Sequence, residues 1–241
     1  MKLRVVTPVV RVGKPHSDPR EYVARMRRLT NICQETQLDT VRIDKGPASI
    51  ESRYDEVLAC PSIVKRVVEA EVDGVDAVVI NCFGDPGVRA SREMVKIPVV
   101  GPCESSMLVA SSLCNKFSVL TIVNNVIPLI EENAMIYGLS SKVASVRAID
   151  IPVLELHSDR EKTVEALCEE GRKAIEEDGA EVLILGCTGM TGMAERIEKE
   201  LGVFVLDPLP TALKFAETLA CLGLTHSKIT YPMPPEKQRI E

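Results

Sequence analysis

Short apolar runs alternate along the chain with longer segments in which apolar residues recur at helical spacing. The short runs predict strands at residues 3–10, 38–43, 75–81, 97–101, 117–123, 142–149, 180–186 and 203–207. The longer segments predict helices at residues 19–36, 91–96, 104–116, 127–138, 159–178, 189–201 and 210–222, and one that starts near Pro61. The chain is therefore expected to alternate between strand and helix from end to end.

This alternation predicts an α/β fold with parallel strands, because a helix between two strands returns the chain to the same edge of a sheet. The predicted strands are rich in Val, Ile and Leu, which is typical of a sheet covered by helices on both faces. Eight strands in 241 residues fit two four-stranded units better than one closed barrel. We therefore predict two α/β units.

An internal repeat supports the two units. Residues 73–82 (DGVDAVVINC) match residues 178–187 (DGAEVLILGC), and each copy ends in a cysteine, Cys82 or Cys187. The loops that follow, CFGDPG and CTGMTG, share the pattern CxGxxG. Repetition at a fixed spacing indicates a duplicated structural unit.

The repeat places both cysteines at the carboxyl ends of strands, where open parallel sheets bind ligands. If the two units pack about a pseudo-twofold axis, the thiols of Cys82 and Cys187 face each other across a cleft. Two acid–base groups opposed in this way are suited to removing a proton from one face of a carbon and returning it to the other. The sequence therefore favours proton-transfer chemistry in the cleft between the units.

The loops suggest how the thiols would work. A thiol near a helix start has a lowered pKa, since the free N–H groups and the helix dipole favour the thiolate. We expect one thiolate and one thiol at neutral pH, titrating as a coupled pair. Glycines such as Gly84 and Gly189 would let backbone N–H groups approach the substrate. This chemistry requires no cofactor.

Composition narrows the other possibilities. The net charge is −6, only 3% of residues are aromatic and there is no Trp, which argues against nucleic acid as a partner. No apolar run reaches the roughly 20 residues that span a bilayer, and the start does not resemble a signal peptide, so we expect a cytoplasmic protein. The eight cysteines form no CxxC pair, so no metal site is expected.

Four segments resemble the aspartate/glutamate/hydantoin racemase superfamily, most closely its hydantoin and allantoin racemase branch. They are NCFGDPGV (81–88), IPVVGPCESSM (97–107), FSVLTI (117–122) and LGCTGMTGM (185–193). The resemblance implies a cofactor-independent, two-base racemase or epimerase with two pseudo-symmetric Rossmann-like (flavodoxin-like) units. It also implies a first domain of residues 1–101 plus 208–241, a second of residues 102–207, and a homo-oligomer.

The resemblance assigns roles to individual residues. Cys82 and Cys187 match the two catalytic cysteines. On the side of Cys187, Thr188 matches a position that binds substrate. The amides of Phe83 and Gly84 would bind on the side of Cys82. Thr121 matches a further position that lines the site.

One turn departs from the pattern. Hydantoin racemases usually carry an Asn-rich turn after the first strand, whereas this chain has Thr7-Pro8-Val9-Val10. Thr7 keeps one hydroxyl for the substrate, but the amide side chains are absent. The expected substrate is a 5-substituted hydantoin, allantoin or a related amino-acid derivative. An amino-acid racemase and a maleate-isomerase-like enzyme stay open as alternatives.

Two other readings are weaker. The run GCTGMTG does not form a dinucleotide-binding fingerprint, so we do not expect a nucleotide. Of the three histidines, His16, His157 and His226, we expect His157 at the surface or in a loop rather than in the cleft. A non-catalytic, two-lobed sensor of small molecules is the alternative from a different class, and it has no need of two facing thiols.

Overall fold

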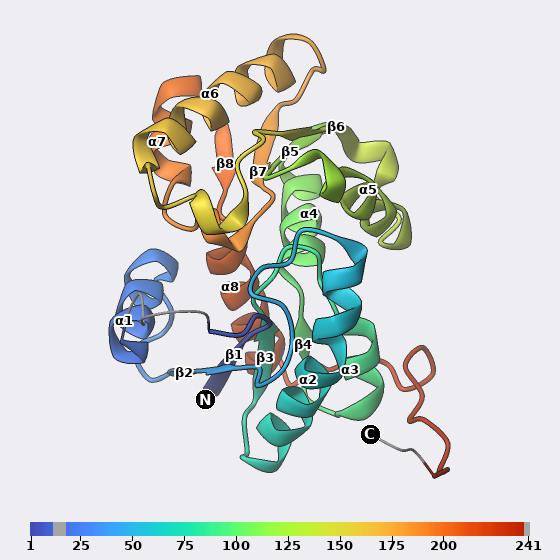
Figure 1. Cartoon of the computed structure of the whole chain (residues 1–241). Coiled ribbons are helices and arrows are strands. Elements are labelled where there is room, and N and C mark those ends of the chain that lie inside the picture. Colours follow the sequence, from blue (N-terminus) through green and yellow to red (C-terminus); the bar gives the residue numbers. More distant parts are fainter. Residues whose placement is uncertain (12–17, 239–241) are drawn as a thin grey trace.

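Residues 1–11 and 18–238 are described by a computed structural model of the chain (Figure 1). The first sheet contains strands β1 (Lys2–Thr7), β2 (Gln37–Arg42), β3 (Ala77–Ile80) and β4 (Val99–Val100). All its strands are parallel, in the order β2-β1-β3-β4. The order reverses between β1 and β3, so a ligand-binding crevice is expected at the carboxyl ends of these two strands.

The second sheet repeats the first. It contains β5 (Phe117–Thr121), β6 (Val143–Ala148), β7 (Val182–Leu185) and β8 (Phe204–Leu206), all parallel, in the order β6-β5-β7-β8. Its corresponding crevice lies at the ends of β5 and β7. The predicted class, two pseudo-symmetric α/β units each with a four-stranded parallel sheet, is confirmed.

Eight α-helices accompany the strands in the described part of the chain. They are α1 (Pro19–Thr30), α2 (Arg53–Val72), α3 (Val88–Met94), α4 (Pro102–Leu113), α5 (Ile127–Ile136), α6 (Arg160–Glu176), α7 (Ala194–Leu201) and α8 (Pro208–Cys221). Short 3-10 turns are η1 (Asn124–Val126), η2 (Ser140–Lys142), η3 (Val153–Glu155) and η4 (Thr188–Met190).

Helices cover both faces of the first sheet. Side chains alternate between the two faces along each strand, so a strand that is apolar at every position needs cover on both sides. Val78 and Ile80 of β3 pack in one core with residues of α2. Ala77 and Val79, which point the other way, pack in a second core with α1 and α8. Both faces of β3 are therefore apolar and buried, which explains its unbroken run of Ala, Val and Ile.

Helices α4 and α8 exchange between the two sheets. Helix α4 follows β4 of the first sheet but packs against β7 and α5, and α8 follows β8 of the second sheet but packs against β1, β3 and β4. The two helices also pack on each other at the centre of the molecule (Figure 1). The division into residues 1–101 plus 208–241 and residues 102–207 stays a prediction.

One helix start differs from the prediction. Helix α2 begins at Arg53 rather than near Pro61, because Ser52 caps it by accepting a hydrogen bond from the Asp55 amide at 3.2 Å. Pro61 lies inside the helix. The early start adds two turns of helix, including Glu56, to the part of the molecule near the cysteine loops.

Two further findings concern the rest of the chain. In the part that the structure describes, no helix is long and apolar enough to cross a membrane. His16 and residues 239–241, the end of the predicted first domain, lie outside the described residues.

Candidate active site

A cavity of about 760 Å³ lies where the carboxyl ends of the two sheets meet. Seven of the eight site residues predicted from the sequence line it: Thr7, Cys82, Phe83, Gly84, Cys187, Thr188 and Gly189. Thr121 is not among its lining residues. The Thr121 side chain is fully buried and its hydroxyl donates to the Gly186 carbonyl at 3.4 Å, behind the Cys187 loop.

The strands explain how the two cysteines reach one cavity. Cys82 follows β3 and Cys187 follows β7 by two residues each, and both strands are buried along their whole length. Each strand neighbours the point where the strand order reverses in its sheet. The two loops touch directly, since the Thr188 hydroxyl donates to the Asn81 carbonyl at 3.2 Å. The residues beside the two cysteines are thus joined across the units.

Each sulfur lies against the glycine two residues further on. The Gly189 amide donates to Cys187 Sγ at 3.3 Å, and a Cβ at Gly189 would lie 3.3 Å from the same sulfur. A Cβ at Gly84 would lie 3.8 Å from Cys82 Sγ and would collide with the Glu56 carboxylate. Both positions therefore need glycine for these close contacts. The predicted approach of their amides to a substrate stays a prediction.

The protonation state differs from the one expected. Burial raises the pKa of Cys82 well above its ordinary value, and the Gly84 amide opposes this while the charge of Cys187 adds to it. Burial also raises the pKa of Cys187, to about 11, against the lowering effect of the Gly189 amide. The pKa of both thiols is thus raised rather than lowered as expected, because desolvation outweighs hydrogen bonds from short turns.

The loop after Cys82 is tied to the second unit by a buried carboxylate. Asp85 accepts hydrogen bonds from the amides of Cys103 at 3.0 Å and Glu104 at 2.9 Å, at the start of α4. The Tyr137 hydroxyl, at the end of α5, donates to Asp85 at 2.8 Å. Burial raises the pKa of Asp85 to about 7, although these donors favour its ionised form.

The loop after Cys187 is also held by a carboxylate, but here the loop supplies the donors and the helix start supplies the carboxylate. Here the carboxylate belongs to the residue before the helix, Asp207, which precedes α8. It accepts hydrogen bonds from the Thr191 hydroxyl at 3.0 Å and the Gly192 amide at 2.5 Å. Each cysteine loop is therefore fixed to the start of one of the two exchanged helices.

Most of the remaining wall is apolar and was missed by the sequence analysis. It includes Ile50, Ile122, Val126, Leu129, Ile130, Val153, Leu154 and Leu209. These residues come from four separate segments, and their apolar pattern is the same as that of ordinary core positions. Only the tertiary arrangement distinguishes a cavity wall from a core.

Several polar lining residues were also missed. They are Tyr22, Arg25, Glu56, Asn81, His157, Ser158 and Arg160. Glu56 precedes the predicted helix, because the start of α2 was predicted near Pro61 rather than at Arg53. His157 was expected away from the cleft but lines it, because η3 turns the chain after β6 back towards the Cys187 loop. Among the described residues, no cluster of three or more His, Cys, Asp or Glu could hold a metal ion.

The chain is similar to known racemases over its full length. A family model described as Asp/Glu/Hydantoin racemase matches residues 21–216. A hydantoin racemase from Pseudomonas sp. (strain NS671) is 44% identical over 241 residues, which cover 100% of this chain and 94% of that protein.

Solved structures agree with this similarity. The allantoin racemase from Pseudomonas fluorescens superimposes with a TM-score of 0.90 at 32% identity and 100% coverage of both chains. The allantoin racemase from Klebsiella pneumoniae gives a TM-score of 0.90 at 31% identity, with 100% of this chain and 96% of that chain covered. On the family match and the full-length similarity, the chain belongs to the Asp/Glu/Hydantoin racemase family.

Proposed function

We propose that the protein is a cofactor-independent racemase that inverts a carbon next to a carbonyl in a 5-substituted hydantoin, with Cys82 and Cys187 as its two acid–base groups. The observation that carries the proposal is the presence of both cysteines, one from each sheet, on the wall of one cavity. The 44% identity to a hydantoin racemase supports the same substrate class.

In the proposed reaction one cysteine acts as a thiolate. It removes the proton from C5, the C–H electron pair moves into the neighbouring carbonyl, and an enolate forms together with an S–H bond. The thiol of the other cysteine gives its proton to the opposite face of C5, and the carbonyl reforms. The product is the mirror image of the substrate, and the two cysteines have exchanged protonation states.

Backbone amides would stabilise the enolate oxygen. The Cys82 and Cys187 loops both carry glycine amides at the cavity, where the peptide backbone is exposed without a side chain. N–H groups aimed at a developing oxyanion in a site of low dielectric lower the barrier to proton removal. The Gly84 and Gly189 amides also lower the pKa of the two thiols, although burial has the larger, opposite effect.

The apolar wall supports a hydantoin with an apolar 5-substituent. A cavity lined by Ile, Leu and Val favours a ligand that removes apolar surface from water. Allantoin is the second candidate, because two allantoin racemases share the whole fold. Its polar ureido group would gain less than an apolar substituent from the Ile, Leu and Val side chains of the wall, so we rank it below hydantoins.

A racemisation assay tests the proposal. We expect single enantiomers of 5-benzylhydantoin to racemise faster with the protein than without it. With the protein present, they should also racemise faster than enantiopure allantoin. Chiral chromatography would follow both compounds. Preferential racemisation of allantoin would overturn the substrate assignment, and no racemisation of any tested hydantoin, allantoin or amino acid would favour the small-molecule sensor.

A further inference from the structure

A buried carboxylate, Glu56 of α2, lies on the cavity wall near Cys82. Its residue is only 5% exposed, yet it lines the cavity. A carboxylate removed from water needs hydrogen-bond donors for both of its oxygens. The hydrogen-bond partners of Glu56 therefore indicate which groups of a ligand could bind at this part of the wall.

The two oxygens of Glu56 have different surroundings. Oε2 accepts a hydrogen bond from the Arg53 guanidinium at 2.8 Å. The same guanidinium pairs with Glu132 of α5 in the other unit, which holds Arg53 in place. Oε1 lies against the backbone of Gly84, so close that a Cβ on this residue would collide with it. Since that Cβ would also be 3.8 Å from Cys82 Sγ, the carboxylate and the sulfur flank the same glycine.

We propose that Glu56 is a specificity-determining residue that accepts a hydrogen bond from the substrate N–H group next to the reacting carbon. This inference rests on the proposed racemase function. The sulfur of Cys82 must reach the hydrogen on that carbon, and a carboxylate oxygen on the other side of Gly84 then faces the neighbouring ring atom. In a hydantoin this atom is N1, which carries a hydrogen.

A second buried acceptor makes this part of the wall suited to donors. Asn81 lines the cavity immediately before Cys82, and its Oδ1 is buried without a hydrogen-bond partner in the described part of the chain. Its Nδ2 donates to the Tyr22 hydroxyl at 3.2 Å. A cyclic ureide has N–H donors to offer to both acceptors.

The test compares two ligands that differ at one ring position. 2-Benzylsuccinimide has the shape of 5-benzylhydantoin but carries CH₂ in place of N1–H. Binding is measured as the ligand concentration that halves the rate of Cys82 alkylation by iodoacetamide, which requires no turnover. In the wild type we expect the concentration that halves the alkylation rate to be about 10- to 100-fold higher for 2-benzylsuccinimide than for 5-benzylhydantoin, because the succinimide leaves Glu56 without a hydrogen-bond donor.

The variants decide whether Glu56 causes this ratio. In Glu56→Leu we expect the ratio to fall to about threefold or less, and in Glu56→Gln, which keeps an acceptor oxygen, to an intermediate value. Glu132→Gln is the matched control, since Glu132 contacts the same Arg53 but does not line the cavity, and it should keep the wild-type ratio. If Glu56→Leu does not fold, Glu56→Gln carries the comparison.

An unchanged ratio in the Glu56 variants, or an equal loss in Glu132→Gln, would overturn the inference. The racemisation assay keeps this result separate from the proposed function. A protein that racemises 5-benzylhydantoin with an unchanged ratio contradicts the role of Glu56 alone. A protein that shows the expected ratios but racemises nothing contradicts the racemase function alone.

Discussion

The two cysteines have closely matched surroundings. Each lies at the end of a buried strand and against a glycine two residues on, and in each case burial is the largest influence on the pKa, which it raises. A buried thiolate is costly, so the resting site favours two thiols. A thiolate then forms as a minor species, and the proposed reaction depends on how readily it forms.

The first prediction concerns this ionisation. Because the pKa of Cys187 is raised to about 11 and that of Cys82 is also raised, the thiolate fraction of each should grow about tenfold for each pH unit between 7 and 9. We expect the rate of alkylation by iodoacetamide, followed by peptide mass spectrometry, to rise in the same proportion. A rate that levels off below pH 8 would mean that the loop amides outweigh burial.

Asp85 provides a second prediction at this scale. The pKa of Asp85 is raised from 3.8 to about 7. Protonation of Asp85 therefore adds to the free energy of unfolding, in full below about pH 3.8, and this contribution is lost as the pH rises through 7. Relative to Asp85→Asn, which cannot titrate, the wild type should lose about 2–3 kcal/mol of unfolding free energy between pH 5 and pH 8.

Urea unfolding at several pH values would measure this difference. Asp159→Asn is the control, because Asp159 caps α6 from an exposed position by accepting from the Lys162 amide at 3.1 Å. A constant difference between the wild type and Asp85→Asn across this pH range would show that the Asp85 carboxyl has no raised pKa.

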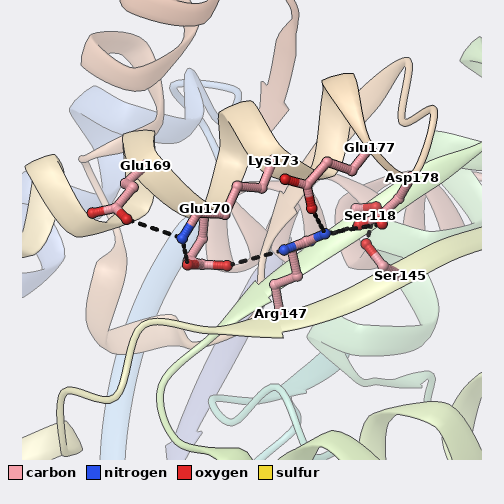
Figure 2. A network of polar contacts seen from close by, with 8 residues as sticks. All are labelled: Ser118, Ser145, Arg147, Glu169, Glu170, Lys173, Glu177 and Asp178. Carbon is pink, nitrogen blue, oxygen red and sulfur yellow. Dashed lines mark hydrogen bonds and ion pairs between the residues drawn. The ribbon is translucent and has the colours of Figure 1, made fainter.

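At the scale of elements, ion pairs hold the edge strand β6 to the end of α6 (Figure 2). Arg147 of β6 donates to both carboxylate oxygens of Asp178, at 2.5 and 2.9 Å, and pairs with Glu177 at 2.8 Å. Ser118 and Ser145 share a hydrogen bond of 2.8 Å between β5 and β6. The edge strand is thus fixed by side chains as well as by its ladder.

Removing the arginine should therefore weaken the second unit. Arg147→Ala leaves Asp178, whose pKa the guanidinium lowers, without its bidentate partner. We expect a loss of about 1–2 kcal/mol of unfolding free energy, measured by urea unfolding. Arg172→Ala removes an exposed pair with Glu200 at 3.4 Å and should cost less than about 0.5 kcal/mol. Equal losses in the two variants would contradict the role of the network.

The elements were largely predictable because their periodicity is strong. Each predicted strand appears in the structure, and most are shortened, whereas β2 keeps its predicted length and begins one residue earlier. Each predicted helix also has a counterpart. The helix predicted over residues 189–201 instead splits into η4 and α7. Pro61 misled the prediction of α2, because a proline that opens a helix and one that lies inside it look alike in sequence.

The candidate site was predictable where the chain repeats and, at Thr7, from the resemblance of the chain to hydantoin racemases. The matching loops identified Cys82, Cys187, Gly84 and Gly189. A residue that recurs at the same place in both copies of a repeat is more readily recognised as functional than one that occurs in a single copy. Glu56 and Tyr22 gave no comparable signal, because neither belongs to the internal repeat. Each lies on a helix that is separated in sequence from the Cys82 and Cys187 loops. Their place on the cavity wall depends on how the helices pack.

At the scale of the whole molecule, the two units are joined through the active site itself. Helices α4 and α8 exchange between the sheets, and Asp85 and Asp207 fix the cysteine loops to these helices. The Thr188 hydroxyl donates directly to the Asn81 carbonyl, which joins the two loops. The relative position of the two sulfurs is thus set by several contacts rather than by one hinge. The proposed chemistry depends on this arrangement, because each sulfur must address its own face of the carbon.

The most direct test follows hydrogen exchange at C5 of each enantiomer of 5-benzylhydantoin in heavy water, with the uncatalysed rate subtracted. We expect Cys82→Ser and Cys187→Ser both to lose racemisation, and each still to exchange the proton of one enantiomer only, a different one in each variant. Cys33→Ser, which changes an exposed cysteine outside the cavity wall, should exchange and racemise both enantiomers as the wild type does. Exchange of both enantiomers at wild-type rates in either active-site variant would contradict the two-sided arrangement of Cys82 and Cys187.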